Sequence, residues 1–342
     1  MCKVSIIVPI YNEENTLERC LNSLHQQTFS DFEVLLINDG STDSSLEICE
    51  KYEKLDDRFK IFTQENAGPS AARNLGIDRA GGEFIYFVDA DDHIELNAIE
   101  KMYDEAKYWK ADVTICGFYR ITDKTITIHE YPYPRGLHEG EACRKIAIDL
   151  LDNMSPPYLP PYAWIRLIRA DVLKKHHLRF AEKVKRNEDY LFTTELHFRI
   201  DRLFIIDEPL YNCIESKDSI TINYVRDYWS MAKHIYHELM DKLPHEAEIW
   251  EKLDLMLVKR SVLAFNNACR TQDKDAFKKE ISEIISDEEL LQAVKMTAFS
   301  SGFKKTGIYF LLMRMKLYGL VKWRYSLKRK INTKKDHSYE NY

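Results

Sequence analysis

The chain has 342 residues, of which 45% are hydrophobic and 30% charged, a composition that does not fit a disordered chain, a collagen or a disulfide-stapled miniprotein. Its net charge of -6 argues against a nucleic-acid partner, because domains that bind nucleic acid usually carry a basic surplus. Residues 303–335 nevertheless hold eleven Lys or Arg and no Asp or Glu, so a basic C-terminal segment follows an acidic body.

The cysteine pattern and the chain start favour a cytoplasmic protein. The seven cysteines are scattered without a C-x-x-C pair, and this odd number favours reduced thiols. The first three residues lead directly into an apolar run, so we expect no signal peptide. The longest apolar run near the C-terminus, residues 308–313, is much shorter than the roughly 20 residues that a membrane helix needs.

The first third of the chain alternates two periodicities. Short apolar runs typical of strands buried on both faces lie at residues 4–9, 33–38, 59–63 and 83–88. Helical patterns lie between them, at residues 17–24, 46–52 and 69–80. This alternation predicts an α/β unit with a mainly parallel sheet, and such sheets bind ligands at the carboxyl ends of their strands.

The later part of the chain is less regular. Two β-rich runs between residues 112 and 131 predict antiparallel or edge strands. Helices are expected at residues 139–151 and 187–199, a strand at 203–214, and a proline-rich linker or active-site wall at 155–162. After about residue 223 the pattern is helical, so we place a domain boundary near residue 222.

Acidic side chains follow the fourth predicted strand, in the sequence Asp89-Ala90-Asp91-Asp92. Carboxylates gathered at one sheet edge repel one another unless a cation lies among them, and they suit a hard divalent cation such as Mg²⁺ or Mn²⁺. Such a metal usually takes one or two carboxylates and completes its shell with substrate phosphates. The structural alternative is a helix N-cap for a helix that begins near Glu95.

Two further strand ends carry candidate ligand contacts. Asp39, in the turn after the second strand, is a candidate acceptor for a ring N–H of a nucleotide base, although turn formation and capping by Thr42 or Asp43 also explain this segment. The helix start at Gly68 offers free N–H groups to an anion, and Arg73 adds a cation. The alternative for Arg73 is a simply solvated side chain.

These segments together resemble the family 2 glycosyltransferases of the GT-A fold. The matching text is VSIIVPIYNEE, then VLLINDGSTDSS, then ENAGPSAARNLGIDRAGGEFIYFVDADD. The resemblance implies a GT-A catalytic domain over residues 1–222, followed by a helical region over 223–342. It also implies transfer of a sugar, with inversion, from a nucleotide-sugar to an acceptor hydroxyl.

The resemblance carries residue roles with it. Asp39 would read the base, usually uracil, and Asp89 and Asp91 would form the D-x-D motif for Mn²⁺ or Mg²⁺, with Asp91 favoured as the direct ligand. Asn38 departs from a second Asp that family members often have there. The remaining expected contacts to the nucleotide-sugar are Pro9, Tyr11, Asn12, Glu14, Gly68 and Arg73.

Two later segments also match the family. Glu188 and Asp189 resemble its E-D motif, in which the Asp is the catalytic base; we favour Asp189 and keep Glu188 as the second choice. Acidic residues in the first turn of a helix are the structural alternative. Trp164-Ile165-Arg166-Leu167 resembles W-x-K-L, which implies a role for Arg166 near the diphosphate or the acceptor, although Arg and Lys are not geometrically equivalent.

The expected activity is metal-dependent glycosyl transfer, most often from a UDP-sugar in this family, to a glycan or lipid-linked acceptor in capsule, lipopolysaccharide or exopolysaccharide synthesis. A sugar-nucleotide-forming nucleotidyltransferase and a non-catalytic scaffold of the same fold are the alternatives. The basic tail is amphipathic, so it either lies on an anionic membrane at the inner face of the cell or packs on the catalytic domain.

Overall fold

A computed structural model describes residues 2–129, 131–151, 159–184, 186–215 and 224–297. The chain divides into two compact units, one of residues 1–153 with 157–217 and one of residues 154–156 with 218–342. The boundary predicted near residue 222 lies outside the described residues, as do residues 155–158 of the proline-rich segment and the whole basic tail.

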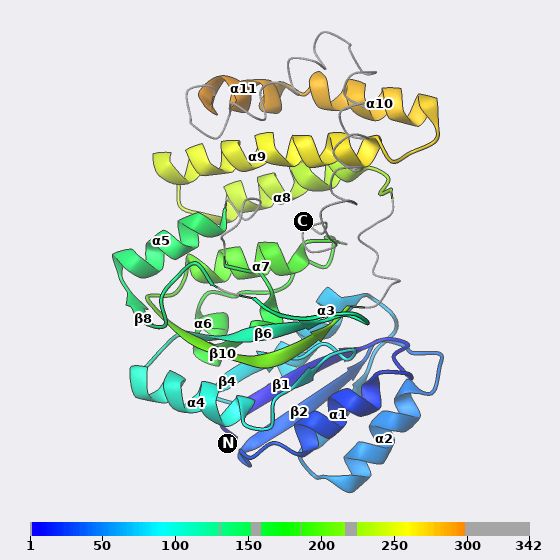
Figure 1. The fold of residues 1–342 in the computed structure, drawn as a ribbon, viewed down its shortest axis with the longest axis vertical. Helices are drawn as coiled ribbons and strands as arrows, with labels where there is room; N and C mark the ends of the chain where they lie inside the picture. Colours follow the sequence, from blue (N-terminus) through cyan, green and yellow to red (C-terminus); the bar gives the residue numbers. More distant parts are fainter. Residues whose placement is uncertain (1, 130, 152–158, 185, 216–223, 298–342) are drawn as a thin grey trace. The chain divides into compact units, whose positions relative to one another are not determined.

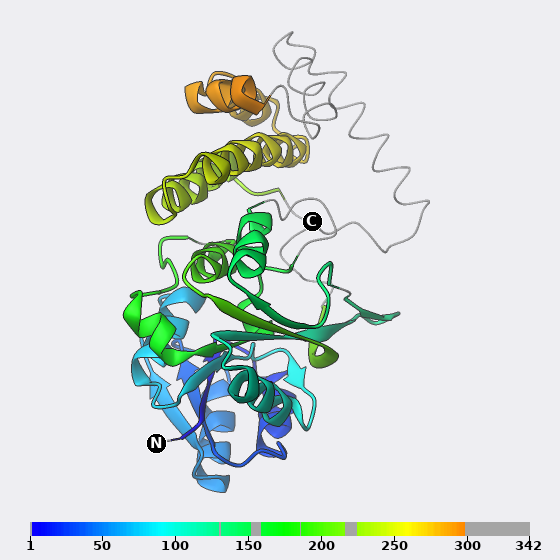
Figure 2. The same ribbon diagram turned by 90° about the vertical axis from the view of Figure 1, so that its left-hand side faces the viewer.

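One mixed sheet forms the centre of the first unit, shown in Figures 1 and 2. The described residues place its strands in the order β3-β2-β1-β4-β9-β6-β10-β5, with β7 added on β6 and β8 on β10. The strands are β1 Val4–Ile10, β2 Phe32–Asn38, β3 Phe59–Thr63, β4 Phe84–Phe87, β5 His93–Ile94, β6 Val113–Ile121, β7 Ile126–Ile128, β8 Gly136–Glu139, β9 Arg166–Arg169 and β10 Arg202–Ile214.

The first four strands confirm the predicted parallel unit. β1 runs parallel to both β2 and β4, and β2 runs parallel to β3. The chain passes from β1 outward to β3 and then returns to β4 on the other side of β1, so the strand order reverses between β1 and β4. A ligand crevice is expected at the carboxyl ends of strands that flank such a reversal.

Helices cover this sheet. Right-handed crossovers place α1 and α2 on one face and α3 on the other, as Figure 1 shows. Gly76 allows α3 to lie close to β1, because a Cβ at that position would be only 2.3 Å from Ile7 Cγ2. The helices of this unit are α1 Leu17–His25, α2 Ser45–Leu55, α3 Pro69–Arg79, α4 Ala98–Trp109, α5 Glu141–Leu150, α6 Ala170–Lys175 and α7 Glu188–His197, with a short 3-10 turn η1 at Ala163–Ile165.

The second half of the sheet differs from the sequence prediction. β6 is neither an edge strand nor wholly antiparallel, because it lies between β9 and β10 and runs parallel to β10. The strand β9 was not predicted, since its four residues begin and end with Arg and show no apolar run. The helix expected near Glu95 begins only at Ala98, because the short strand β5 comes first.

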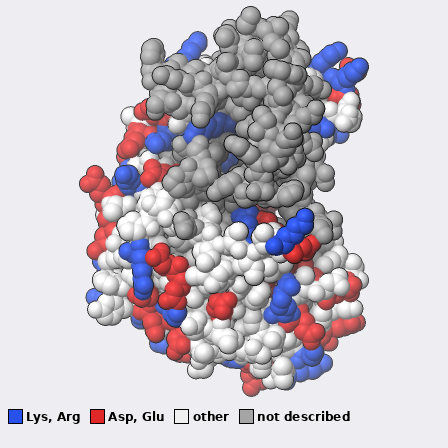
Figure 3. All heavy atoms as spheres, in the orientation of Figure 1, with Lys and Arg blue, Asp and Glu red and all other residues white. Residues whose placement is uncertain are grey.

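Charged side chains of both signs are interspersed on the described part of the face shown in Figure 3. Many of them form exposed ion pairs, such as Lys107 with Glu83 at 2.7 Å. Exposed pairs of this kind contribute at most about 1 kcal/mol each, so the fold depends mainly on the apolar core around the sheet.

The second unit is helical in its described residues, as the sequence predicts. Its helices are α8 Tyr228–Lys242, α9 Ala247–Ala268, α10 Lys274–Ile285 and α11 Glu288–Thr297. The Asp273 side chain caps α10 by accepting the N–H groups of Asp275 at 2.8 Å and Ala276 at 3.1 Å. None of the helices in the described ranges combines the length and the apolar character that crossing a bilayer requires.

Candidate active site

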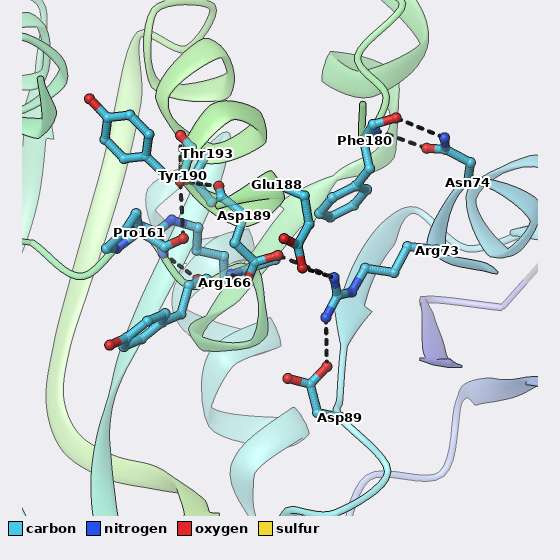
Figure 4. A network of polar contacts seen from close by, with 12 residues as sticks. Arg73, Asn74, Asp89, Pro161, Arg166, Phe180, Glu188, Asp189, Tyr190 and Thr193 are labelled. Atoms are coloured by element: carbon cyan, nitrogen blue, oxygen red, sulfur yellow. Dashed lines mark hydrogen bonds and ion pairs between the residues drawn. The ribbon is translucent and has the colours of Figure 1, made fainter. Parts of the chain in front are cut away.

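Arg73 joins three carboxylates from two segments that lie far from each other in the sequence. Its guanidinium, on α3, is 2.9 Å from Asp89 Oδ1 at the end of β4 and 3.4 Å from Glu188 Oε1 at the start of α7. It is also 3.3 Å from Asp189 Oδ1. Figure 4 shows these side chains converging on the guanidinium. Four predicted site residues therefore form one cluster at the carboxyl end of β4.

Arg73 is not the solvated side chain that the alternative interpretation describes. Only 6% of the residue is exposed, and its guanidinium carbon lies 5.2 Å from the ring centre of Phe180. Burial alone would lower the pKa of Arg73, but Asp189, Asp89 and Glu188 outweigh it and raise that pKa above its usual value. The guanidinium is thus permanently charged and held against the carboxylates.

Hydrogen bonds and ring contacts fix α3 beside α7. Asn74 donates its amide N–H to the Phe180 carbonyl and accepts the Phe180 N–H, each at 2.9 Å. Phe180 in turn stacks on Phe192 of α7 with ring centres 4.0 Å apart. These contacts, partly visible in Figure 4, set the position at which Arg73 meets the α7 carboxylates.

Asp189 has the environment of a tuned acid–base group. Its Oδ2 accepts the Ala163 N–H at 3.2 Å, while the buried Oδ1 has no hydrogen-bond donor and only the ion pair with Arg73. Desolvation raises the pKa of Asp189, Arg73 lowers it, and Glu188 and Asp89 raise it again, with a net value of about 6. A carboxyl of this pKa can accept a proton near neutral pH far better than an ordinary Asp can.

The turn after β4 contains two kinds of carboxylate. Asp91 is exposed, and desolvation of its carboxyl together with the charges of Asp89 and Glu13 raises its pKa to about 6. Asp92 is buried and belongs to the protein interior, because its Oδ2 accepts the Tyr211 hydroxyl at 2.8 Å. The segment therefore does not form a simple N-cap, since α4 begins only at Ala98.

The D-x-D carboxylates fit a divalent cation as partial ligands. Among the described residues, no three His, Cys, Asp or Glu side chains are grouped so that they hold a metal by themselves. Asp89 and Asp91 nevertheless repel each other, and this repulsion contributes to the raised pKa of Asp91. A cation bound nearby would lower that pKa again. Mg²⁺ and Mn²⁺ accept such incomplete sites when water and phosphate oxygens supply the remaining ligands.

Asp39 is buried at the end of β2 and already has protein donors. Its Oδ1 accepts the Gln64 side-chain N–H at 2.7 Å and the Ala67 N–H at 2.9 Å, and its Oδ2 accepts the Gly68 N–H at 2.8 Å. Gly68 has a φ of 91°, which favours glycine at the residue before α3. Sequence reasoning missed Gln64, although its position directly after β3 is a strand-end signal like the others.

The predicted nucleotide-pocket residues after β1 also hold the loop after β2. Asn12 Oδ1 accepts the Thr42 N–H at 2.8 Å, and Glu14 Oε2 accepts the Ser44 N–H at 3.1 Å. Tyr11, between β1 and these contacts, is 48% exposed. The loops after β1 and β2 thus form one wall beside the β4 turn.

Pro9 lies within β1 and is paired with Ile37 of β2. It has no partner on β4, because the β1–β4 pairing ends at Ile7 and Phe87. A proline is tolerated there because no β4 carbonyl needs its missing N–H. The end of the β1–β4 pairing thus lies at the point where the strand order reverses.

Arg166 does not line this surface. It is completely buried, and its guanidinium donates to the carbonyls of Pro160, at 2.8 Å, and of Tyr162. Its Nε donates to His197 Nε2 at 3.2 Å. Because burial dominates, the pKa of Arg166 falls to about 10. In this structure the Arg166 side chain fixes the loop that precedes η1, and its predicted role near the diphosphate or acceptor stays a prediction.

A hollow of about 420 Å³ lies at the opposite end of the strands, and three of the charged groups that line it, Glu33, Arg58 and Lys60, already form ion pairs. Glu33, for example, accepts from Lys60, Ser5 and the Gly81 N–H. This hollow brings together none of the predicted site residues, so the carboxyl ends of the strands remain the candidate site.

The chain is similar to known glycosyltransferases. The family model described as "Glycosyl transferase family 2" matches residues 5–175. The glycosyltransferase EpsJ of Bacillus subtilis, named as uncharacterized, is 33% identical over 307 residues, which cover 86% of this chain and 87% of EpsJ. The poly(ribitol-phosphate) beta-N-acetylglucosaminyltransferase TarS of Staphylococcus aureus is 28% identical over 254 residues, which cover 72% of this chain and 42% of TarS.

Solved structures agree on the fold. The crystal structure of residues 1–349 of S. aureus TarS in complex with UDP superposes with a TM-score of 0.71, covering 96% of this chain and 92% of that chain at 23% identity. A second TarS structure holds UDP-GlcNAc and superposes with a TM-score of 0.72 at 23% identity and the same coverage. The mixed sheet and the helices around it therefore form the expected GT-A fold.

Proposed function

The chain belongs to glycosyl transferase family 2, and we propose that this glycosyltransferase moves a sugar from a UDP-sugar to a hydroxyl group of a surface glycan or lipid-linked acceptor, with inversion. The UDP assignment is supported by the TarS complexes with UDP and UDP-GlcNAc. The acceptor class is supported by the name of TarS, which acts on poly(ribitol-phosphate). Family membership disfavours the nucleotidyltransferase alternative.

The observation that carries the proposal is the Arg73 cluster. It holds a half-buried carboxyl of raised pKa, Asp189, next to the end of β4, where Asp89 begins the D-x-D turn. An inverting transfer needs such a base within reach of the acceptor hydroxyl that attacks the anomeric carbon, while the leaving group is bound at that turn. This combination of groups favours an enzyme over a scaffold without catalytic function.

In the proposed reaction, the Asp189 carboxylate accepts the proton of the acceptor hydroxyl while the hydroxyl oxygen attacks the anomeric carbon. The new glycosidic bond forms as the bond from that carbon to the UDP oxygen breaks. Asp39 and the exposed Tyr11 ring lie where the base and its ribose would bind, between the ends of β1 and β2. Glu188 shares Arg73 with Asp189 and is the alternative base.

Asp89 and Asp91 would hold a Mn²⁺ or Mg²⁺ ion in this proposal. When bound, the ion neutralises negative charge on the diphosphate leaving group. Asp91 is the favoured direct ligand because it is exposed and forms none of the ion pairs that hold Asp89.

The proposal is tested by calorimetry with UDP and Mn²⁺ and by UDP release from a panel of UDP-sugars. We expect UDP to bind and at least one UDP-sugar to be turned over. Asp189→Asn should lower turnover by about 10²–10⁴-fold with nearly unchanged UDP affinity, since a base meets the acceptor and not the nucleotide. A larger loss in Glu188→Gln than in Asp189→Asn would reverse the two roles, and absence of UDP binding would refute the donor assignment.

A further inference from the structure

The hydroxyl of Tyr211 lies at the centre of the turn that carries the D-x-D carboxylates. Tyr211, on β10, is completely buried, and its hydroxyl oxygen accepts the Asp89 N–H at 3.1 Å. The same hydroxyl donates to Asp92 Oδ2 at 2.8 Å. Asp92 Oδ1 then accepts the Ile214 N–H, also from β10, at 2.7 Å. Three hydrogen bonds thus tie β10 to residues 89–92, more than 100 positions earlier in the chain.

The Tyr211 ring is itself fixed. It stacks on Trp164 of η1, with ring centres 4.3 Å apart and planes inclined by 22°. Ala163, the residue before Trp164, donates its N–H to Asp189 Oδ2 at 3.2 Å. A continuous series of contacts therefore runs from the D-x-D turn through Tyr211 and η1 to Asp189, in addition to the ion pairs with Arg73.

We propose that Tyr211 is a positioning residue that holds the D-x-D turn in the conformation required for the metal-bound diphosphate. This inference rests on the proposed function, because it assumes that Asp89 and Asp91 meet that group. Tyr211 is too deeply buried to touch a ligand, so it acts through the backbone of Asp89 and through Asp92.

The physical basis is the cost of unpaired polar groups. Without the Tyr211 hydroxyl, the Asp89 N–H and one oxygen of Asp92 would lack a partner in a place that excludes water. The turn would then move to recover hydrogen bonds, and Asp91, which has no side-chain hydrogen bond of its own among those identified, would move with it. Binding would have to reorder the turn, and this lowers affinity.

The test compares Tyr211→Phe with Tyr52→Phe. The first variant keeps the ring that stacks on Trp164 and removes only the hydroxyl. Tyr52 is a matched control, because it is also buried and its hydroxyl donates to the Glu18 carbonyl at 3.2 Å, on α1 and away from the turn. For both variants we measure thermal stability, UDP affinity by calorimetry with Mn²⁺ and with EDTA, and kcat and KM for the donor.

In Tyr211→Phe we expect UDP affinity with Mn²⁺ to fall about tenfold, because the hydroxyl no longer orders the turn. Affinity with EDTA should be unchanged, and KM should rise more than kcat falls. Tyr52→Phe should lower the melting temperature without changing either affinity. If Tyr211→Phe binds UDP like the wild type under both conditions, Tyr211 only stabilises the fold and the inference is overturned.

A second variant guards against a Tyr211→Phe protein that does not fold. Asp92→Asn keeps the acceptor for the Ile214 N–H but presents an amide to the Tyr211 hydroxyl, and it should show the same Mn²⁺-dependent loss. Normal Mn²⁺-dependent affinity in this variant would contradict the inference. Failure of the wild type to bind UDP is a different result, because it refutes the proposed donor and not the positioning role.

Discussion

Replacement of Arg73 by Met should make the enzyme require a higher pH. Arg73 is the charge that lowers the pKa of Asp189 most, while burial, Glu188 and Asp89 all raise it. An opposite charge at this distance commonly lowers a carboxyl pKa by about 1–3 units. Its loss should therefore raise the Asp189 pKa from about 6 to roughly 7–9.

The rate consequence follows from the ionised fraction. With a pKa of about 6, about nine-tenths of Asp189 is ionised at pH 7. With a pKa of roughly 7–9, between about half and a hundredth remains ionised, so kcat/KM at pH 7 should fall by about two- to hundredfold from this effect alone. The loss should shrink as the pH rises, because a growing fraction of the base is then ionised in the variant.

The assay is the pH profile of kcat/KM for UDP release. Arg73→Lys keeps the charge and should shift the acidic limb much less than Arg73→Met. Arg79→Met is the matched control, because Arg79 lies on the same helix but is exposed and contacts only the Phe62 ring among the described interactions, with its guanidinium 5.3 Å from the ring centre. Arg73→Met should also be less stable by about 3–5 kcal/mol, since three buried or half-buried carboxylates lose their partner.

An acidic limb that stays in place in a folded Arg73→Met protein would refute this reasoning. It would mean either that Asp189 is not the base or that Arg73 does not control its pKa. The two explanations separate through Asp189→Asn, which must abolish the acidic limb if Asp189 is the base.

Three further predictions concern the metal, the sheet edge and the tail. Asp91→Asn should weaken UDP binding only when Mn²⁺ is present and should abolish transfer, and full activity in Mn²⁺ would contradict the metal assignment. Glu33→Gln should destabilise the protein by roughly 2–3 kcal/mol at pH 7, because hydrogen bonds from Lys60, Ser5 and Gly81 overcome burial and lower the Glu33 pKa to about 2. This contribution to stability is present above about pH 4.5 and is lost as the pH falls towards 2. Urea unfolding should therefore show a smaller difference in stability between the two proteins at pH 3 than at pH 7. Removal of residues after 302, which lie outside the described residues, should abolish flotation with anionic liposomes at low salt, and equal flotation of both proteins would exclude the tail as the anchor.

The sequence was a good guide where strands are continuous apolar runs. β1, β2 and β4 are buried on both faces, so their sequences are mostly apolar, and the parallel arrangement of the first four strands could be predicted from their alternation with helices. The strands β5 and β9 have two and four residues, too few for any periodicity, and β9 together with β10 places β6 inside the sheet. Such short strands form because they pair with adjacent strands of the sheet, and their own residues show no strand pattern.

The site was predictable in its residue types but not in its pairing. Motif resemblance indicated Arg73, Asp89 and Asp189 separately, as an anion contact, a metal ligand and a base. Nothing local indicates that one guanidinium joins all three, because that depends on how α3 and α7 pack through Phe180. Arg166 shows the opposite case, since a charged motif residue is directed inward to backbone carbonyls by the loop around it.

The charge balance of the cluster bears on the proposed metal dependence. Arg73 supplies one positive charge against Asp89, Glu188 and Asp189, and Asp91 adds a further carboxylate beside Asp89. A diphosphate that approached this site alone would meet an excess of negative charge at short range, and burial would make the repulsion stronger than in water. A divalent cation at Asp89 and Asp91 removes that excess and lets the same carboxylates, including an ionised Asp189, remain in place around the donor. On this argument the excess of carboxylates over positive charges adds to the effect of desolvation in raising the pKa of Asp189, and the same excess underlies the proposed metal dependence.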